Sequence, residues 1–459
     1  MPTTSHPQSG PPPSSAPEAW EPLLRFARFA GRPIELFLRI EAASGILLFA
    51  AAAVALAWAN SPWSESYQWF WHVPLGIRVG AFSFERTLEW FVNDGLMVIF
   101  FFVVGMEIRR EMDHGELSEW RRAALPTAAA LGGMIVPAGL YLVVAGVPET
   151  RSGWGVPMAT DIAFAVGVLT LLGSRAPASL RVLLLALAVI DDLGAILVIA
   201  LFYSSGIEAA GLVVALFGFG GILAMQRFGV RMKLAYVVPA VVAWAGIYAA
   251  GIHPTIAGVI VGLLTPVRAW LGPDGFIARV REELELLDPS VDVESRKAGL
   301  FVGLRNVAVA RREAVSPADS LIEMLHPWVA FGIMPVFALA NAGVAFSGLA
   351  LGGSSLRVAM GSAAGLVVGK PLGILFACWL ALRFRIGTLP EGITFRHLVV
   401  LGFVAGIGFT MALFIAQLAF TDAALLDAAK LGVLIASAGA AIFGLVAGTR
   451  LLAPPSAMR

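Results

Sequence analysis

The chain has 459 residues, of which 58% are apolar and 14% are charged. Soluble domains carry about 25% charged residues, so this composition excludes a soluble globular enzyme and predicts a polytopic membrane protein. The formal net charge of +1 provides no basic field for a nucleic-acid partner, and the single cysteine, Cys378, excludes a disulfide framework or a cysteine metal cluster.

The first residues are rich in Pro, Ser and Thr, and we predict a disordered tail over residues 1–33 and a short tail over residues 453–459. Residues 34–452 are predicted to form a single all-α transmembrane domain of about 12 helices, because the apolar runs approach the length that crosses a bilayer and lack the alternation of barrel strands. The candidate spans are 37–59, 90–108, 123–145, 153–172, 182–203, 208–225, 234–250, 253–267, 319–343, 358–382, 397–420 and 431–449.

Basic residues concentrate in alternate connections between these spans. Because Lys and Arg remain on the cytoplasmic side, this pattern predicts that both termini are cytoplasmic. The connection 60–89 then faces outward, and turn residues within 72–86 separate short apolar alternations that are typical of a small hairpin. The connection 268–318 faces inward, and its mixed charges predict a solvated loop.

Five ionisable residues fall inside the predicted spans, where a charged side chain costs several kcal/mol. They are Asp94, Asp161, Asp191, Asp192 and Lys370. Lys370 lies about ten residues from either end of its span, beyond the reach of snorkelling, so we expect it to pair with one of the aspartates. Acids that converge on one buried base would form a site that neutralises itself by taking up protons or a cation.

Asp191 and Asp192 are adjacent near the middle of the fifth span. Consecutive helical residues point about 100° apart, so one carboxylate is expected to face a water-filled cavity while the other contacts a neighbouring helix. Like-charge repulsion between them favours the uptake of a proton or a cation.

Gly and Pro interrupt two spans near their midpoints. Gly153, Gly155 and Pro157 precede Thr160 and Asp161 in the fourth span, and the eleventh span contains Gly406, Gly408 and Thr410. Such residues allow a helix to unwind, which frees carbonyl oxygens that suit a small alkali cation together with carboxylates and hydroxyls. Close packing of helices is the alternative explanation for the glycines.

Four segments together resemble the bacterial NhaA-type sodium/proton antiporter family, over about residues 30–450. They are Ala159-Thr160-Asp161, Ile190 to Ala195, Gly369-Lys370-Pro371 and Ala405 to Thr410. The resemblance implies that spans 3–5 and 10–12 are inverted repeats whose broken helices, spans 4 and 11, cross near the ion site. It also implies a bacterial inner-membrane location, no cofactor, and a possible homodimer through 72–86.

The resemblance implies a role for each matching residue. Asp192 would be the main cation and proton ligand, with Asp191 as its partner at the sodium site and as the counter-ion of Lys370. Thr160 and Asp161 would help to ligate the cation or balance half-helix dipoles.

The resemblance also points to five residues with accessory roles in ion entry and the pH response. They are Asp94, Glu107, Glu323, His253 and His326. From its neighbours alone, Glu107 is equally well explained as an interfacial ion pair with Arg109 or Arg110. His253 is better explained as a packing residue at a helix end.

One departure concerns the pH response. The family commonly has Leu-Glu-His shortly before His-Pro-Trp, whereas this chain has Ile322-Glu323-Met324 before Leu325 and His326. The acidic residue is shifted and one histidine is missing, so the family's pH threshold does not carry over.

These features predict an electrogenic antiporter that exports Na⁺ or Li⁺ in exchange for H⁺ and serves pH and sodium homeostasis. Cation and protons would compete for the same aspartates while the site is exposed to one side of the membrane at a time. A membrane enzyme, with the acids at a diphosphate site or a protease dyad, fits less well because no second acidic cluster is present and the buried lysine has no role. A passive cation channel lined by the same charges is the other alternative.

Overall fold

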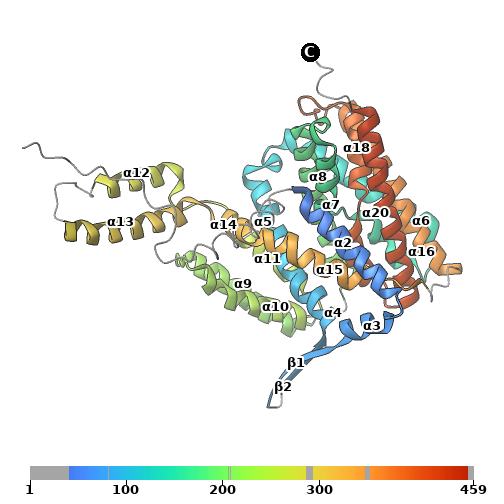
Figure 1. Ribbon diagram of the computed structural model, residues 1–459, viewed down its shortest axis with the longest axis horizontal. Coiled ribbons are helices and arrows are strands. Elements are labelled where there is room, and N and C mark those ends of the chain that lie inside the picture. Colours follow the sequence, from blue (N-terminus) through green and yellow to red (C-terminus); the bar gives the residue numbers. More distant parts are fainter. Residues whose placement is uncertain are drawn as a thin grey trace, which may run out of the picture.

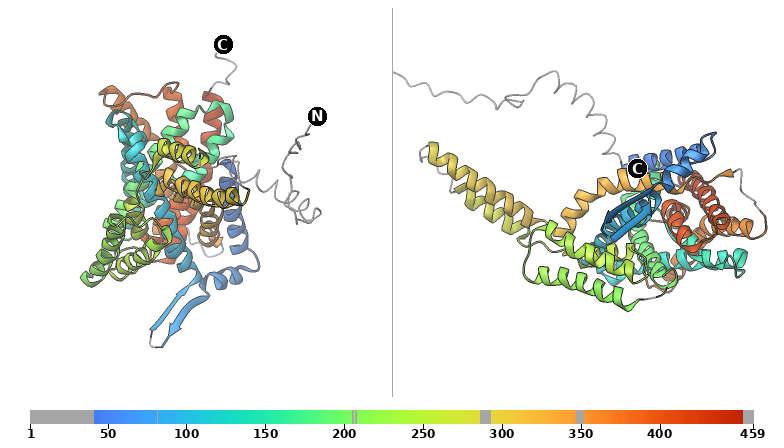
Figure 2. Two further views of the ribbon diagram at one scale, coloured as in Figure 1. Left: turned by 90° about the vertical axis from the view of Figure 1, so that its left-hand side faces the viewer. Right: turned by 90° about the horizontal axis from the view of Figure 1, so that it is seen from below.

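The computed structural model describes residues 41–80, 82–204, 206, 208–285, 293–346 and 352–452. Figure 1 shows a bundle of long helices, from one end of which a two-stranded hairpin projects, and a pair of helices that extends sideways. The views in Figure 2 show the same two projections from other sides. The tails predicted over residues 1–33 and 453–459 lie outside the described residues.

Seven helical segments of the described chain are long and apolar enough to cross a membrane. Three of them are continuous helices: α6 (Trp120–Ala145), α8 (Ala178–Phe202) and α9 (Ala209–Arg227). A fourth runs from α4 to α5 over Leu88–His114. The others are α14 to α15 over Pro317–Asn341, α16 to α17 over Gly353–Arg383, and α20 (Ala423–Leu451). The protein is therefore an all-helical polytopic membrane protein.

Three of these segments contain one π-helical turn. These turns are η1 (Phe91–Leu96) between α4 (Leu88–Trp90) and α5 (Met97–His114), η6 (Val329–Ile333) between α14 (Pro317–Trp328) and α15 (Met334–Asn341), and η8 (Gly365–Gly369) between α16 (Gly353–Ala364) and α17 (Lys370–Arg383). Such turns are frequent at functional sites. Asp94 lies within η1, and Lys370 directly follows η8.

Three further pairs of helices are bent at a short break, so the count rises to 10 if each pair is one span. The pairs are α2 (Glu41–Ala59) with α3 (Ser64–His72), bent by 114°, η3 (Arg151–Met158) with α7 (Ile162–Leu171), bent by 41°, and α18 (Phe395–Ala405) with α19 (Phe409–Ala419), bent by 47°. Two shorter apolar helices, α10 (Val237–Ala249) and α11 (Thr255–Leu264), coincide with two more predicted spans. The count of twelve stays a prediction.

The predicted hairpin is confirmed. Strands β1 (Pro74–Val79) and β2 (Phe82–Thr87) pair antiparallel, with Pro74 opposite Thr87 and Val79 opposite Phe82. Gly80 begins the turn with φ +60°, a conformation that glycine adopts without strain. We call the end of the bundle that carries β1 and β2 the hairpin side (Figure 1).

The connection expected to be a solvated loop instead contains two helices, α12 (Gly272–Glu285) and α13 (Val293–Ala314). They pack as the arm that leaves the bundle sideways in Figure 1. Glu283 is buried between them and accepts a hydrogen bond from Asn306 Nδ2 at 2.9 Å. One of the charged residues in this connection thus joins the two helices, which the charge pattern alone does not reveal.

Glycines allow close packing in two pairs of helices, α6 with α17 and α5 with α11. A Cβ at Gly132 of α6 would lie 2.2 Å from the carbonyl oxygen of Gly373 in α17, and a Cβ at Gly105 of α5 would lie 2.5 Å from that of Val259 in α11. Only glycine allows such backbone contact, which small residues typically provide in membranes. The contact between α6 and α17 holds Lys370 in the interior of the bundle.

Candidate ion-binding site

The breaks in the fourth and eleventh predicted spans meet in the interior of the protein. Residues 159–161 separate η3 from α7, and residues 406–408 separate α18 from α19. The backbone N–H of Asp161 donates to the carbonyl oxygen of Ile407 at 2.7 Å. A Cβ at Gly408 would lie 2.9 Å from the carbonyl oxygen of Ala159, so the crossing requires glycine there. The predicted broken helices and their crossing are therefore observed.

Asp161 caps two helices at this crossing. Its Oδ1 accepts from the backbone N–H of Phe164 in α7 at 3.0 Å, and its Oδ2 accepts from the backbone N–H of Thr410 in α19 at 3.1 Å. The Thr410 hydroxyl donates to the same Oδ2 at 2.5 Å. A carboxylate between two helix N-termini is stabilised by both macrodipoles. This geometry supports the balancing of half-helix dipoles, which was one of the two roles expected of Asp161.

Lys370 and Asp191 form a buried ion pair. Lys370 Nζ lies 2.7 Å from Asp191 Oδ2, and neither side chain is exposed to solvent. The ammonium also donates to the carbonyl oxygen of Met158, at the end of η3. The expected pairing of the lysine with an aspartate is observed, and snorkelling is excluded because Lys370 is fully buried.

Thr160 connects this ion pair to the helix crossing. Its hydroxyl lies 2.7 Å from Asp191 Oδ2 and 3.0 Å from the carbonyl oxygen of Ala405. One hydroxyl hydrogen serves one acceptor at a time, so Thr160 can exchange its donation between a carboxylate and a freed helix carbonyl. Both half-helices that end at the breaks therefore contribute oxygen atoms near Asp191.

Asp192 is buried beside this pair, with 2% of its surface exposed. Its Oδ1 and the Oδ1 of Asp191 are buried and have no hydrogen-bond donor among the described residues. Buried polar atoms are nearly always paired, so these two oxygens on adjacent residues are free to accept a proton or a small cation. The residues that sequence reasoning could not name here are the carbonyl donors Met158 and Ala405, since every residue has a carbonyl.

Glu107 lies close enough to Asp192 for the two carboxylates to repel each other, whereas Asp94 and His253 contact each other. Asp94 Oδ1 is 3.7 Å from His253 Nδ1, and the His253 ring packs on Phe414 at 5.3 Å between centroids. Glu107 is half-buried, and among the described residues no basic side chain lies within 4 Å of it. The expected alternative of an interfacial ion pair with Arg109 or Arg110 is therefore not observed.

Glu323 and His326 are exposed on α14. Arg110 of α5 lies 3.9 Å from Asp319, which is in the first turn of the same helix, α14. The contacts described for these residues do not reach the buried aspartates. Their accessory role in the pH response stays a prediction.

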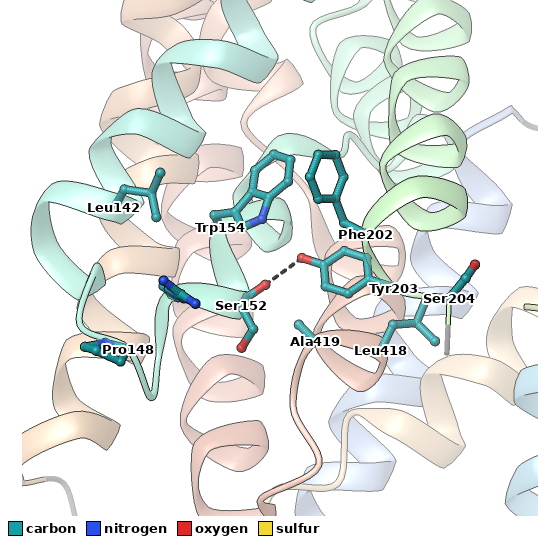
Figure 3. A pocket seen from close by; sticks show the side chains of 10 residues that line it. Leu142, Pro148, Ser152, Trp154, Phe202, Tyr203, Ser204, Leu418 and Ala419 are labelled. Carbon is teal, nitrogen blue, oxygen red and sulfur yellow. Dashed lines mark hydrogen bonds between the residues drawn. The ribbon is translucent and has the colours of Figure 1, made fainter. Parts of the chain in front are cut away.

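A cavity of about 580 Å³ lies beside η3 (Figure 3). Its lining residues come from the ends of α6, α8 and α19 and the start of η3: Leu142, Pro148, Arg151, Ser152, Trp154, Phe202, Tyr203, Ser204, Leu418 and Ala419. The Tyr203 hydroxyl donates to the carbonyl oxygen of Ser152 at 2.6 Å, as Figure 3 shows. None of the buried aspartates lines this cavity, so it is separate from the candidate ion site.

Two interrupted helices that cross beside buried carboxylates and one buried lysine define a class of protein, the secondary ion transporters. In this class, irregular backbone within the membrane provides ligands in the protein interior.

Comparison with known proteins identifies the family. The model of a family described as Na⁺/H⁺ antiporter 1 matches residues 35–447. A Na(+)/H(+) antiporter NhaA 2 of Myxococcus xanthus is 69% identical over 454 residues, which covers 98% of this chain and 97% of the relative. A Na(+)/H(+) antiporter NhaA 2 of Sorangium cellulosum is 53% identical over 97% of this chain and 95% of its own length, and a Na(+)/H(+) antiporter NhaA of Bordetella petrii is 48% identical over 95% and 94%. The chain belongs to the Na⁺/H⁺ antiporter family, and it exchanges sodium for protons across a membrane.

Proposed function

We propose that Na⁺ and protons compete for Asp191 and Asp192, and that the site is exposed to one side of the membrane at a time. The observation that supports this best is the pair of buried Oδ1 atoms without donors on adjacent aspartates. A carboxylate oxygen in that condition gains from either a proton or a hard cation. Because one set of oxygens binds both, the exchange needs no separate coupling device.

Lys370 supplies the charge that makes the exchange electrogenic in this proposal. With a proton on Asp192 and an ion pair between Asp191 and Lys370, the site is neutral. Sodium at the two aspartates competes with the ammonium for Asp191, and the lysine then releases a proton in addition to the one from Asp192. Two protons for one sodium move one net charge, on which an inward-negative potential acts with roughly 2.3 kcal/mol per 100 mV.

We infer that Li⁺ replaces Na⁺ and that K⁺ does so poorly, because a tight oxygen cage suits small cations. The distribution of basic residues supports an orientation with both termini cytoplasmic and the hairpin side outward, and membership of this family supports a bacterial inner membrane. In that orientation an inward proton gradient drives sodium out, which serves pH and sodium homeostasis. The projecting hairpin, which includes much of 72–86, supports a homodimer through β1 and β2 (Figure 2).

Proteoliposomes that contain a pH-sensitive dye test these points. We expect NaCl and LiCl, but scarcely KCl, to drive proton movement, and we expect an imposed membrane potential to change its rate. A rate that does not depend on the potential would refute the electrogenic cycle. Sodium flux without proton movement would support the channel alternative.

A further inference from the structure

A second buried polar cluster lies on the hairpin side of the ion site. It consists of the carboxylate of Glu89 in α4 and three amide side chains from segments that are far apart in the sequence: Asn93 in η1, Asn341 at the end of α15, and Gln417 in α19. Asn93 is 8% exposed and Asn341 is fully buried, while Gln417 and its neighbour Glu89 are half-buried. We call these four residues the amide cluster.

All six amide hydrogens of the three side chains have acceptors. Asn93 Nδ2 donates to Asn341 Oδ1 at 3.3 Å and to Gln417 Oε1 at 3.2 Å. Asn341 Nδ2 donates to Asn93 Oδ1 at 2.7 Å and to the carbonyl oxygen of Phe337 at 2.9 Å. Gln417 Nε2 donates to Asn341 Oδ1 and, at 3.3 Å, to Glu89 Oε1. A polar network with every donor satisfied specifies one arrangement of the helices that carry it.

The cluster joins the helix that carries part of the ion site to helices that do not. Gln417 is seven residues beyond Thr410 on α19, which places the two side chains on one face of the helix and about 10 Å apart along its axis. Thr410 donates to Asp161 at the helix crossing. A movement of α19 that changes access to the ion site therefore moves Gln417 as well.

Asn341 is held in place by neighbouring segments. The Tyr67 hydroxyl of α3 lies 2.9 Å from the carbonyl oxygen of Leu339 and 3.0 Å from that of Ala340, next to Asn341. Asn60 Nδ2 donates to the carbonyl oxygen of Val344 at 2.8 Å. Asn341 is thus fixed to α2 and α3, and Gln417 is the member that belongs to the ion-site helix.

An aromatic layer lies between the amide cluster and the ion site. Phe414, between Thr410 and Gln417 on α19, is buried with its ring centroid 5.4 Å from that of Phe101 and 6.1 Å from that of Phe337. These rings exclude water, but they have no directional bonds that break and re-form. The amide cluster provides directional hydrogen bonds between the same three helical segments, Leu88–His114, α15 and α19.

We propose that the amide cluster is a latch that closes the route to the ion site from the hairpin side and opens once in each transport cycle. The proposal rests on the proposed alternating access to Asp191 and Asp192. When α19 separates from η1 and α15, the amides exchange one another for water, so opening costs only the modest net free energy of the hydrogen bonds that break. Gln417 and Glu89 thereby position the closed state without contacting the transported ion.

Cysteine labelling tests the latch. The reporter is Leu413→Cys in a Cys378→Ala background, because Leu413 is buried on α19 between Thr410 and Gln417. A membrane-impermeant thiol reagent is applied to the hairpin side or to the opposite side of oriented vesicles. Adding Gln417→Leu is expected to raise the hairpin-side labelling rate about fivefold to tenfold, since one lost hydrogen bond changes an equilibrium by roughly that factor.

Two matched variants control this result. Gln226→Leu removes an amide that donates to the carbonyl oxygen of Leu264 outside the latch, and it should leave labelling unchanged. The exchange Glu89→Gln with Gln417→Glu rebuilds the contact between these two positions with donor and acceptor reversed but loses the donation to Asn341 Oδ1, so it should label more slowly than Gln417→Leu. A merely structural role would not produce this rescue.

Unchanged hairpin-side labelling in Gln417→Leu, or an equal rise from both sides, would overturn the latch. If the reporter protein does not fold, the apparent Na⁺ affinity from each side replaces labelling, and Gln417→Leu should improve it several-fold from the hairpin side only. Sodium/proton exchange by the protein with Gln417 intact is measured in parallel. Its failure would count against the proposed function, whereas labelling reports on the latch alone.

Discussion

The ion pair between Lys370 and Asp191 predicts a specific loss of stability. Lys370→Met removes the ammonium at similar length and leaves a carboxylate that is fully buried without its counter-charge. Removing one partner of a buried ion pair typically destabilises a protein by about 3–5 kcal/mol. We expect the melting temperature of the purified protein to fall by roughly 5 °C or more.

The sign of the pH dependence follows from the same geometry. In Lys370→Met the folded protein favours a protonated Asp191, whereas the unfolded chain does not. Stability is therefore largest in acid and is lost as the pH rises. The parent protein, in which the pair is intact, should show a smaller difference between pH 6 and pH 8 in the same melting assay.

A double variant decides whether the charge is the cause. Lys370→Met with Asp191→Asn removes both charges and keeps an acceptor for the Thr160 hydroxyl, so its stability should return to within about 1–2 kcal/mol of the parent. If the double variant melts as low as Lys370→Met, lost packing rather than the unpaired carboxylate explains the effect. That result would refute the electrostatic reasoning.

Three further outcomes are expected. Asp192→Asn should abolish sodium/proton exchange in proteoliposomes at unchanged melting temperature. Asp427→Asn, which changes a half-buried residue of α20, should retain exchange. Exchange by Asp192→Asn would exclude Asp192 as the ligand. Gly408→Ala places a Cβ 2.9 Å from a backbone oxygen and should lower the melting temperature and the exchange rate, whereas Gly439→Ala, with its nearest neighbour at 3.9 Å, should do neither. Thr410→Val should destabilise by about 1–3 kcal/mol through a lost buried donor, and equal loss in Thr410→Ser would contradict this.

The class of fold was predictable because a membrane leaves the backbone few choices. Within hydrocarbon every backbone N–H and C=O must be satisfied within the protein, so a run of about 20 apolar residues indicates a helix. The same physics made the five charged residues in the spans conspicuous. Gly406 and Gly408 indicated a break for a local reason, since glycine permits the close approach that the crossing requires.

Other features were not predictable from local patterns. The helices of the arm, α12 and α13, arise in a segment of mixed charge that reads as a solvated loop. The amide cluster was missed because Asn and Gln in a span are compatible with many partners.

The sequence by itself determined that this protein is a helical membrane protein with a few buried acids and one buried base, because run length and the cost of intramembrane charge are local properties. Only the tertiary structure decided the partners. Lys370 and Asp191 pair although they are 179 positions apart in the sequence, and Thr410 donates a hydrogen bond to Asp161 although the two are 249 positions apart. Hydrogen bonds and ion pairs act over about 3 Å, so the partner of a buried group depends on how distant helices pack.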